Sequence, residues 1–477
     1  MPICWENIVH TFRFHIVSVI LLAFSLAGAA RAQSILRDAE TEAFFHEISD
    51  PLFVSAGLNP VDVKMFLLAD TSLNAFVSGG QNIFINSGII IRSDNVNQLL
   101  GVIAHEAGHI AGGHLTRFSD VGAIASNTSI LSMVLGAAAI LAGSPDAGIG
   151  LFMAGQSVAL GQVLAYTRVQ ESSADQAGAS YLEDNGISGV GLIEFFEKIR
   201  YQEILAQVRQ NPYIRSHPLN SQRILALNGV VLTSKHYKTP PNPRLNEIFL
   251  RLKAKIIGYL YDPSRTLKMF PVSDTSAAAR YARVYAYHKA LEWDLALAEV
   301  DSLIAMEPEN AYFHEIKGQI LFENGKVRAS LPVFEDAVKY GPEQPLIATA
   351  LGQAMVSLED PAMMERAIPI LKNATRQDTN NSFAWFNLAK AYSWNGKDAL
   401  ASLATAERFY SAGVPPQAML HAKRALDSFS TGTPEWLRAQ DIFFVSKDAV
   451  DRYNRRNKRR RKASGFTFQS STNTHAQ

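Results

Sequence analysis

The hydrophobic pattern divides the chain into a front part of mixed elements and a back part that is wholly helical. Between Ala39 and Ser234, short alternating runs stand among longer apolar runs with helical spacing. Lys64–Leu68 predicts a strand. Asn74–Ser78 and Asn82–Asn86 predict a hairpin, because the turn residues Gly79-Gly80-Gln81 separate them. The front part is therefore typical of an α+β domain.

A helix is predicted shortly after the hairpin. Asn95 followed by Gln98 resembles a helix-capping pair, and the apolar run that begins at Leu99 continues with helical spacing to His109.

A glycine-rich apolar stretch follows, from Ile124 to Ala165. Its longest uninterrupted piece, Ile130–Gly143, has 14 residues and ends at Ser144-Pro145-Asp146. A transmembrane helix needs about 20 apolar residues. We therefore expect a helical hairpin that covers a site or dips into a membrane surface, and two transmembrane helices are the alternative.

The back part, from about Ala277 to Lys447, repeats with a period of 34 residues. Pro308 and Pro342 each close an amphipathic helix pair, and Gly318 and Gly352 fall at the same position of the repeat. This pattern is typical of tetratricopeptide repeats. We expect three clear repeats and a degenerate end, because the register is lost after Gly396. A generic helical bundle is the alternative.

The N-terminus carries an apolar run of its own. Ile16–Ala30 comprises 15 residues between two arginines and ends in Ala30-Arg31-Ala32. The run is short for a membrane span, so it predicts a secretory signal that is removed after Ala32; an uncleaved membrane anchor is the alternative. Cys4 is the only cysteine, so the mature chain would hold any metal with histidine and carboxylate side chains.

Net charge becomes informative only when the chain is divided. The sequence has 45 Lys and Arg residues against 44 Asp and Glu. Residues 452–462 contain eight of the basic ones, which leaves residues 33–451 with a net charge of −8. The composition, 47% apolar and 19% charged, excludes a largely disordered or collagen-like chain. The mature protein is therefore expected to be an acidic body with a basic tail.

Candidate chemistry lies at the end of the predicted helix, in His105-Glu106-Ala107-Gly108-His109. The i, i+4 spacing places both imidazoles on one helix face, where they can share one Zn²⁺. Glu106 is positioned to take a proton from a water on that metal. The motif alone arises often by chance. Here it follows a strand–turn–helix pattern and interrupts an otherwise apolar helix, which favours a metal site.

Three residues are candidates for the third ligand that a catalytic zinc requires. His114 lies one residue before position 115, where H-E-x-x-H-x-x-G-x-x-H has its last histidine, so we interpret it as a surface residue or a partner of a ligand. Glu171 is the stronger candidate, because Asp175 shares its helix face and can orient a ligating histidine. A solvated helix face is the alternative for both carboxylates.

His217 is the third candidate, and it belongs to a loop because Pro218 disfavours helical geometry before it. A histidine there could stabilise the oxyanion of a tetrahedral intermediate, or occupy the open position of the zinc and hold the enzyme off. A capping histidine is the alternative.

Three separated motifs carry a resemblance to a known family. The run from Asn74 to Gly88 leads into HEAGH, and ESSAD and SHPLNSQR follow in order. Together they resemble the gluzincin peptidases of the CAAX prenyl protease, HtpX and Oma type, and in particular the secreted branch that carries C-terminal tetratricopeptide repeats. The resemblance covers nearly the whole mature chain. It implies an α+β zincin-like metallopeptidase domain followed by an all-α tetratricopeptide-repeat domain.

The resemblance also implies roles for single residues. It implies one Zn²⁺ per subunit, with the ligands His105, His109 and Glu171. Glu106 is the implied general base, Asp175 the partner of a ligand, and His217 the active-site loop histidine. Arg223 matches the arginine that follows the loop motif and is expected to contribute to the site. The chain departs from the family pattern in two places: it has the uncharged Ser172-Ser173 where charged residues are often found, and its basic tail is long.

The family's substrate lies along an edge strand, for which Asn74–Ser78 or Asn82–Asn86 is the counterpart. Main-chain pairing there, with Asn74, Ala75 and Phe76, would bind extended peptide with little sequence preference.

By this resemblance we expect a periplasmic zinc endopeptidase for quality control and assembly of outer-membrane proteins, with chaperone activity as a further role. Its partners would be unfolded or misassembled outer-membrane proteins and, through the repeats, the outer-membrane assembly machinery. The alternative is a repeat-based chaperone or adaptor whose metal site is latched by His217. For the basic tail, a solvated end and contact with an anionic membrane surface both stay open, and no nucleic-acid binding is expected.

The expected organisation has five segments. They are a signal peptide (1–32), a zinc metallopeptidase domain (33–238) with the apolar hairpin 124–165, a linker and connecting helix (239–276), the repeat domain (277–448), and a basic, disordered tail (449–477).

Overall fold

The computed structural model describes residues 34–114, 126, 132–133, 145–206, 213, 217–219 and 221–465. The expected signal peptide and nearly all of residues 115–144, which include the first half of the expected hairpin (124–165), lie outside these ranges. Within the described ranges, no helix is both long enough and apolar enough to cross a membrane.

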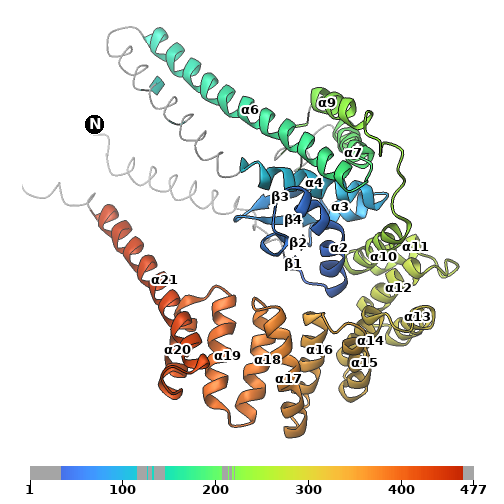
Figure 1. Ribbon diagram of the computed structural model, residues 1–477, viewed down its shortest axis with the longest axis vertical. Coiled ribbons are helices and arrows are strands. Elements are labelled where there is room, and N and C mark those ends of the chain that lie inside the picture. Colours follow the sequence, from blue (N-terminus) through green and yellow to red (C-terminus); the bar gives the residue numbers. More distant parts are fainter. Residues whose placement is uncertain are drawn as a thin grey trace, which may run out of the picture.

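A small sheet lies in the front domain (Figure 1). Its strands are β1 (Ile35–Leu36), β2 (Lys64–Leu68), β3 (Ala75–Ser78) and β4 (Asn82–Asn86), in the order β1-β2-β4-β3. β2 and β4 are parallel, whereas β3 and β4 are antiparallel with Ala75 opposite Ile85. The predicted strands are confirmed. Of the two strands expected to bind substrate, β3 lies at the edge of the described sheet and β4 lies inside it.

Helices complete the core of the front domain. They are α2 (Ala39–Ser55), α3 (Ser87–Arg92), α4 (Val96–Ala111), α6 (Pro145–Asp184), α7 (Val190–Ala206) and α9 (Ser221–Val231), with a 3-10 turn at Pro60–Asp62. α2, α3 and α4 pack against the sheet, α6 and α7 pack on α4, and α9 packs on α6 and α7. Alternation in β4 sends Ile83 and Ile85 into the core. There they belong to one cluster with Leu99, Val102 and Ile103 of α4, and all five are fully buried.

α4, which carries the H-E-x-x-H motif, begins as the capping pair predicts. The Asn95 side chain accepts hydrogen bonds from the backbone N–H groups of Asn97 and Gln98. In return the Gln98 side chain accepts one from the Asp94 N–H. These bonds satisfy donors that a helix start leaves free, so the register of the helix is fixed upstream of the motif.

The back domain is a succession of helix pairs that arcs beneath the front domain (Figure 1). Its described pairs are α12 (Ala277–Lys289) with α13 (Trp293–Met306), α14 (Ala311–Glu323) with α15 (Val327–Tyr340), α16 (Pro345–Ser357) with α17 (Pro361–Gln377), α18 (Ser382–Trp394) with α19 (Asp398–Ser411), and α20 (Pro415–Ser428) with α21 (Pro434–Gly465). Gly318 and Gly352, at the same position of successive repeats, leave no room for a larger residue. A Cβ on Gly318 would lie 2.7 Å from Phe334, and one on Gly352 would lie 2.4 Å from Leu371.

The end of the repeat array is more regular than its sequence predicts. After Gly396 the chain still forms paired helices, although the repeat register is lost. Small side chains fill the core there: Ala406, Ala418 and Ala422 are fully buried and cluster with Ile442. Alanine carries no distinctive pattern, so the pairing in this segment is not visible from residue spacing.

A bridging helix joins the two domains. α10 (Pro243–Leu260) is followed by the short α11 (Pro263–Met269). Phe249, Leu252 and Ile257 of α10 belong to the front core, while on its other side Gly258 lies so close to α12 that a Cβ would be 2.5 Å from the Ala282 carbonyl oxygen. The segment expected as a linker and connecting helix therefore contains a helix that completes the front core.

The basic tail is helical rather than disordered over most of its charged length. α21 continues to Gly465, so the expectation of disorder from position 449 is wrong up to that residue. Lys and Arg favour helices, and Asp448 lies 3.0 Å from the Arg452 side chain at i, i+4 spacing. Residues 466–477 lie outside the described ranges.

Candidate metal centre

The metal centre lies where α4 and α6 pack unusually closely. A Cβ on Gly108, inside the H-E-x-x-H motif, would lie 2.9 Å from the carbonyl oxygen of Ala174. A Cβ on Gly178 would lie 3.1 Å from the backbone of Ala104. Real Cβ atoms seldom come so close to backbone, so these two glycines allow the helices to approach. The approach brings the face of α4 that carries both motif histidines against Glu171 of α6.

Four buried side chains converge at this contact: His105, His109, Glu171 and His217. The His105 and His109 Nε2 atoms are 3.1 Å apart, and Glu171 Oε1 is 3.3 Å from His109 Nε2. Ligands at about 2.0–2.1 Å from a tetrahedral zinc are separated by about 3.3 Å. The spacing of these side chains therefore matches that of ligands around a single metal ion.

Other side chains hold the two motif histidines in orientation. His105 turns its second nitrogen, Nδ1, to Asp175 Oδ1 at 2.9 Å. His109 turns its Nδ1 to His114 Nδ1, also at 2.9 Å. In both rings Nε2 is therefore directed into the cluster, as ligation requires. His114 is a partner of a ligand, which was one of the two interpretations of its position in the sequence.

Arg223 ties the carboxylates of this site to the loop of His217. Its guanidinium donates two hydrogen bonds to Asp175, of 2.7 and 2.8 Å, and lies 3.0 Å from Glu171 Oε2. It also donates to the carbonyl oxygen of Pro218 at 2.9 Å. Arg223 lies behind the ligands, so the structure places it as a positioning residue rather than as a group that faces a reacting atom.

Glu106 is fully buried and faces the cluster without a hydrogen bond. Neither carboxylate oxygen has a hydrogen-bond partner among the described residues, and His217 Nε2 lies 3.6 Å from Glu106 Oε1. A buried carboxylate without donors is costly to keep in a protein core. A metal ion, or a water held on it, would offset that cost.

The charges of the site also fit a divalent cation. Glu106, Glu171 and Asp175 are buried with Arg223 as the compensating cation, which gives a formal charge of −2 with neutral histidines. Burial opposes ionisation of Glu171, but His217, then His105 and His109, hold its pKa well below the ordinary value. Burial likewise opposes ionisation of Asp175, and Arg223 and His105 lower its pKa. Glu171 and Asp175 are thus charged, and one Zn²⁺ would balance the formal charge of the site.

His217 contacts the cluster with one nitrogen and the sheet edge with the other. Its Nδ1 is 3.3 Å from His105 Nε2 and 3.2 Å from both Glu171 oxygens. Its Nε2 is 3.2 Å from the carbonyl oxygen of Ala75 on β3. Because a carbonyl only accepts, Nε2 donates to Ala75, and Nδ1 lies within the cluster, where it could serve as a further ligand of a bound metal. Tyr213 stacks on the ring with centroids 4.7 Å apart.

The structure brings together the predicted site residues. They are the H-E-x-x-H motif and, beside it, Glu171, Asp175, His217 and Arg223. Sequence reasoning missed the two packing glycines and Tyr213. Tyr213 lies four residues before His217, and its backbone carbonyl accepts a hydrogen bond from the His217 backbone N–H. In the sequence, only this i, i+4 spacing indicated that Tyr213 lies near His217. Nothing in the sequence marked Gly108 and Gly178 as contact positions, because their partners lie on another helix.

A buried H-E-x-x-H helix with a carboxylate from a second helix beside it defines a metallopeptidase site. Comparison with known proteins agrees: residues 36–231 match the family model "Peptidase family M48". Residues 36–231 are thus a metallopeptidase domain similar to family M48, and its cofactor is zinc. The fold expected from the sequence, a metallopeptidase domain followed by an all-helical domain, is confirmed.

Curated relatives extend the similarity beyond the peptidase domain. The chain is 24% identical over 385 residues to the beta-barrel assembly-enhancing protease of Yersinia pestis, covering 79% of this chain and 77% of that protein. The protein of the same name from Escherichia coli (strain K12) is 25% identical over 383 residues, with 78% and 76% covered. Metalloprotease LoiP of Escherichia coli (strain K12) is 30% identical over 169 residues, covering 34% of this chain and 60% of LoiP.

One similar solved structure is YrrB, described as a TPR protein with an unusual peptide-binding site. The match has 18% identity and covers 38% of this chain and 94% of YrrB. Its TM-score is 0.31.

Asp175→Asn should weaken zinc binding by about 10–100-fold, because the substitution removes the charge that orients His105 and pairs with Arg223. The shape of the side chain is kept, so the fold should persist. Zinc affinity is measured by competition with a chromogenic chelator. Asp184→Asn, an exposed position on the same helix, is the matched control and should bind zinc as the wild type does. Equal affinity in Asp175→Asn and wild type would contradict the role given to Asp175.

Proposed function

We propose that this protein is a periplasmic zinc endopeptidase that acts in quality control and assembly of outer-membrane proteins. The observation that carries the proposal is the convergence of His105, His109 and Glu171 at ligand-like spacing beside the buried Glu106. These three side chains would hold the zinc, which leaves one coordination position for water or substrate.

Zinc, when bound, supplies a Lewis acid to the scissile carbonyl and to the attacking water. Glu106 takes the proton of that water as general base, because its carboxylate is directed into the site and spends no lone pair on another donor. It then passes the proton to the leaving amine. Asp175 and Arg223 keep the ligands in place during both steps without contacting the substrate.

The substrate would lie along β3. This strand is the free edge of the described sheet, and it runs beside the metal centre, since the Ala75 carbonyl oxygen is 3.2 Å from His217. Main-chain hydrogen bonds along Ala75–Ser78, beginning at Asn74, would hold an extended peptide with little regard to its side chains. Such binding suits unfolded polypeptides as substrates.

The names of the relatives support a role in the assembly of outer-membrane proteins. The similarity to beta-barrel assembly-enhancing proteases covers more than three quarters of those proteins and of this chain. Unfolded or misassembled outer-membrane proteins would be the substrates, and the repeat domain would bind the outer-membrane assembly machinery and contribute chaperone activity. The signal-like pattern of residues 1–32 supports a periplasmic location.

Glu106→Gln should abolish cleavage of casein and of an unfolded porin while zinc stays bound, because glutamine has the same shape and cannot accept the proton. The expected loss is at least about 100-fold. Cleavage is measured by gel densitometry, and zinc by atomic absorption of the same sample. Wild-type cleavage by the zinc-loaded variant would show that Glu106 is not the base.

A second candidate function is a repeat-based chaperone or adaptor with a latched metal site. The position of His217 favours it: Nδ1 lies within the cluster, where it would become a fourth ligand of a bound zinc, and Nε2 lies 3.2 Å from the Ala75 carbonyl oxygen. One side chain would thus occupy both the open coordination position and the first pairing site of the substrate strand. The two functions are compatible if His217 leaves the metal and the Ala75 carbonyl when a substrate binds.

His217→Ala should therefore raise casein cleavage, by about tenfold or more if the latched form dominates at rest. Tyr213 and Arg223 remain to hold the neighbouring structure. The rate is measured with saturating zinc, so that a weakened site does not mask the gain. Unchanged cleavage would contradict the latch, and lost cleavage would instead favour a role for His217 in stabilising the oxyanion.

The basic end of α21 would contact an anionic membrane surface. Arg452, Arg455 and Arg456 are exposed, and a cation contributes roughly 1 kcal/mol at an anionic surface. Removing residues 452–477 should therefore weaken sedimentation with phosphatidylglycerol vesicles at low salt and leave casein cleavage unchanged. Vesicles of phosphatidylcholine serve as the control. Equal sedimentation of the full and shortened chains would show that this end is merely solvated.

A further inference from the structure

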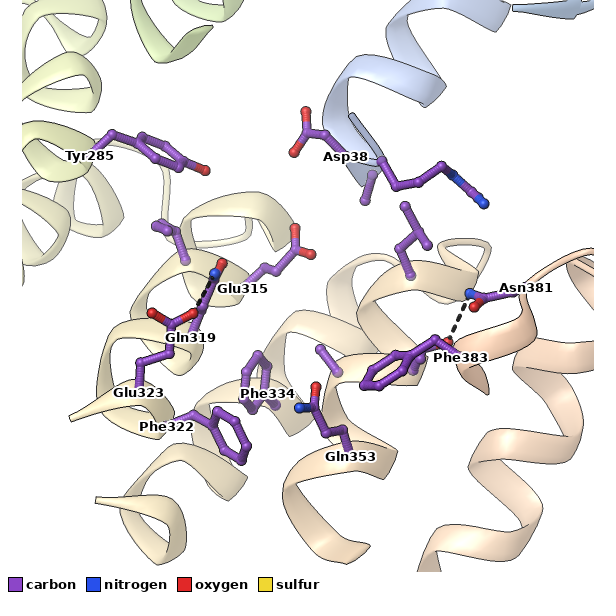
Figure 2. Close-up of a pocket in the computed structure, with 16 residues that line it drawn as sticks. Asp38, Tyr285, Glu315, Gln319, Phe322, Glu323, Phe334, Gln353, Asn381 and Phe383 are labelled. Atoms are coloured by element: carbon purple, nitrogen blue, oxygen red, sulfur yellow. Dashed lines mark hydrogen bonds between the residues drawn. The ribbon is translucent and has the colours of Figure 1, made fainter. Parts of the chain in front are cut away.

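A pocket of about 360 Å³ lies where the repeat domain meets the first helix of the peptidase domain. Figure 2 shows side chains from α14 and α16 and from the start of α18 facing Asp38, which comes from the other domain. The metal centre contributes no residue to it. The pocket is therefore a second site, built jointly by the two domains.

The peptidase domain forms a fixed wall of this pocket. Arg37 bridges the domains, since its guanidinium lies 2.8 Å from Asp378 of the repeat domain and also binds Glu42 of α2. Ala39 is buried in a small cluster with Ala311 and Ile347 of the repeats. These contacts hold the start of α2 across the repeat surface, so the pocket has a defined shape rather than an open end.

Repeated amides and an exposed aromatic ring line the rest of the pocket. Gln319 and Gln353 stand 34 residues apart, at the same position of successive repeats, and both face the pocket. Amide side chains at repeat spacing can bond to successive peptide groups of an extended chain. Phe383 offers an apolar surface, with 47% of its area exposed. This lining suits a polypeptide segment better than a compact metabolite.

One carboxylate of the lining has no counter-ion. Asp38 is bound by Lys255 at 2.6 Å, and Glu323 lies 2.9 Å from His288 and accepts from Gln319. Among the described residues, no hydrogen bond or ion pair reaches Glu315, whose side chain Figure 2 shows directed into the pocket.

The surroundings of Glu315 are short of positive charge. Burial raises the pKa of Glu315 to about 8; Lys255 opposes the rise, while Asp38, Glu40 and Glu42 add to it. Lys255 and Arg37 are already engaged by other carboxylates. A cation brought by a ligand would supply the missing partner.

We propose that this pocket binds a lysine or arginine side chain of an extended client polypeptide, with Glu315 as its counter-ion and Phe383 against its apolar stem. Gln319 and Gln353 would bond to the flanking main chain. The proposal rests on the proposed function only in taking an unfolded polypeptide as the client. It adds a side-chain preference that pairing with β3 alone does not provide.

The test uses two short, fluorescein-labelled extended peptides that differ only in a central lysine or norleucine. They are titrated by fluorescence anisotropy against the zinc-loaded full-length Glu106→Gln protein, which does not cut them, about one pH unit above the pKa of Glu315. We expect the lysine peptide to bind about tenfold more tightly. Glu315→Gln, which keeps the shape of the side chain, should bring the ratio of the two affinities close to one. Glu365→Gln, an exposed site on α17 outside the pocket, should leave the ratio unchanged.

The outcomes are separable. A ratio that Glu315→Gln leaves unchanged, equal binding of both peptides to the protein with Glu315, or no binding of either peptide would overturn the pocket proposal. None of these results bears on the metal centre, since casein cleavage by the wild type and its loss in Glu106→Gln test the peptidase function separately.

Discussion

The burial of three carboxylates in one place is the constraint on which the rest of the front domain depends. Glu106, Glu171 and Asp175 lie within the core, and among the described residues Arg223 is the one arginine or lysine that ion-pairs with them, while the histidines are neutral when they ligate a metal. Two negative charges therefore remain in a poorly solvated site, which is costly without a divalent cation. Metal binding and folding are coupled for this reason: the free energy of zinc binding offsets a penalty that is built into the core.

Helix packing serves the same constraint. The ligands come from two helices, and they reach one another only because glycine faces backbone at both crossing positions, Gly108 and Gly178. The cap at Asn95 sets the phase of α4, so that both histidines face α6 rather than solvent. The short sheet adds β3, whose edge lies beside the metal centre. α4, α6 and β3 thus each bring a polar group to the metal centre, where a bound metal offsets the cost of burying it.

Features that depend on neighbouring residues could be predicted from the sequence, whereas contacts between distant segments mostly could not. The strands, the cap, the i, i+4 motif and the repeat period were predictable, because each depends on spacing within a few residues or on a regular period. Glu171 and His217 were predictable as candidates only, since their distance from the motif is a matter of tertiary structure. The tail was expected to be disordered from its charge, but helix propensity and an Asp448–Arg452 pair keep it helical. The helix pairs after Gly396 and the pocket at Glu315 had no local signature.

The sharing of α10 between the domains has a consequence for how the protein can be divided. The proline-rich segment 239–243 looks like a natural place to separate a peptidase fragment from a repeat fragment. A fragment that ends there would lack Phe249, Leu252 and Ile257, and would expose the apolar surface that these side chains cover. A fragment that includes α10 would instead expose the groove that α12 occupies. Separating the two halves at this junction should therefore destabilise both of them, because each loses a surface that α10 covers.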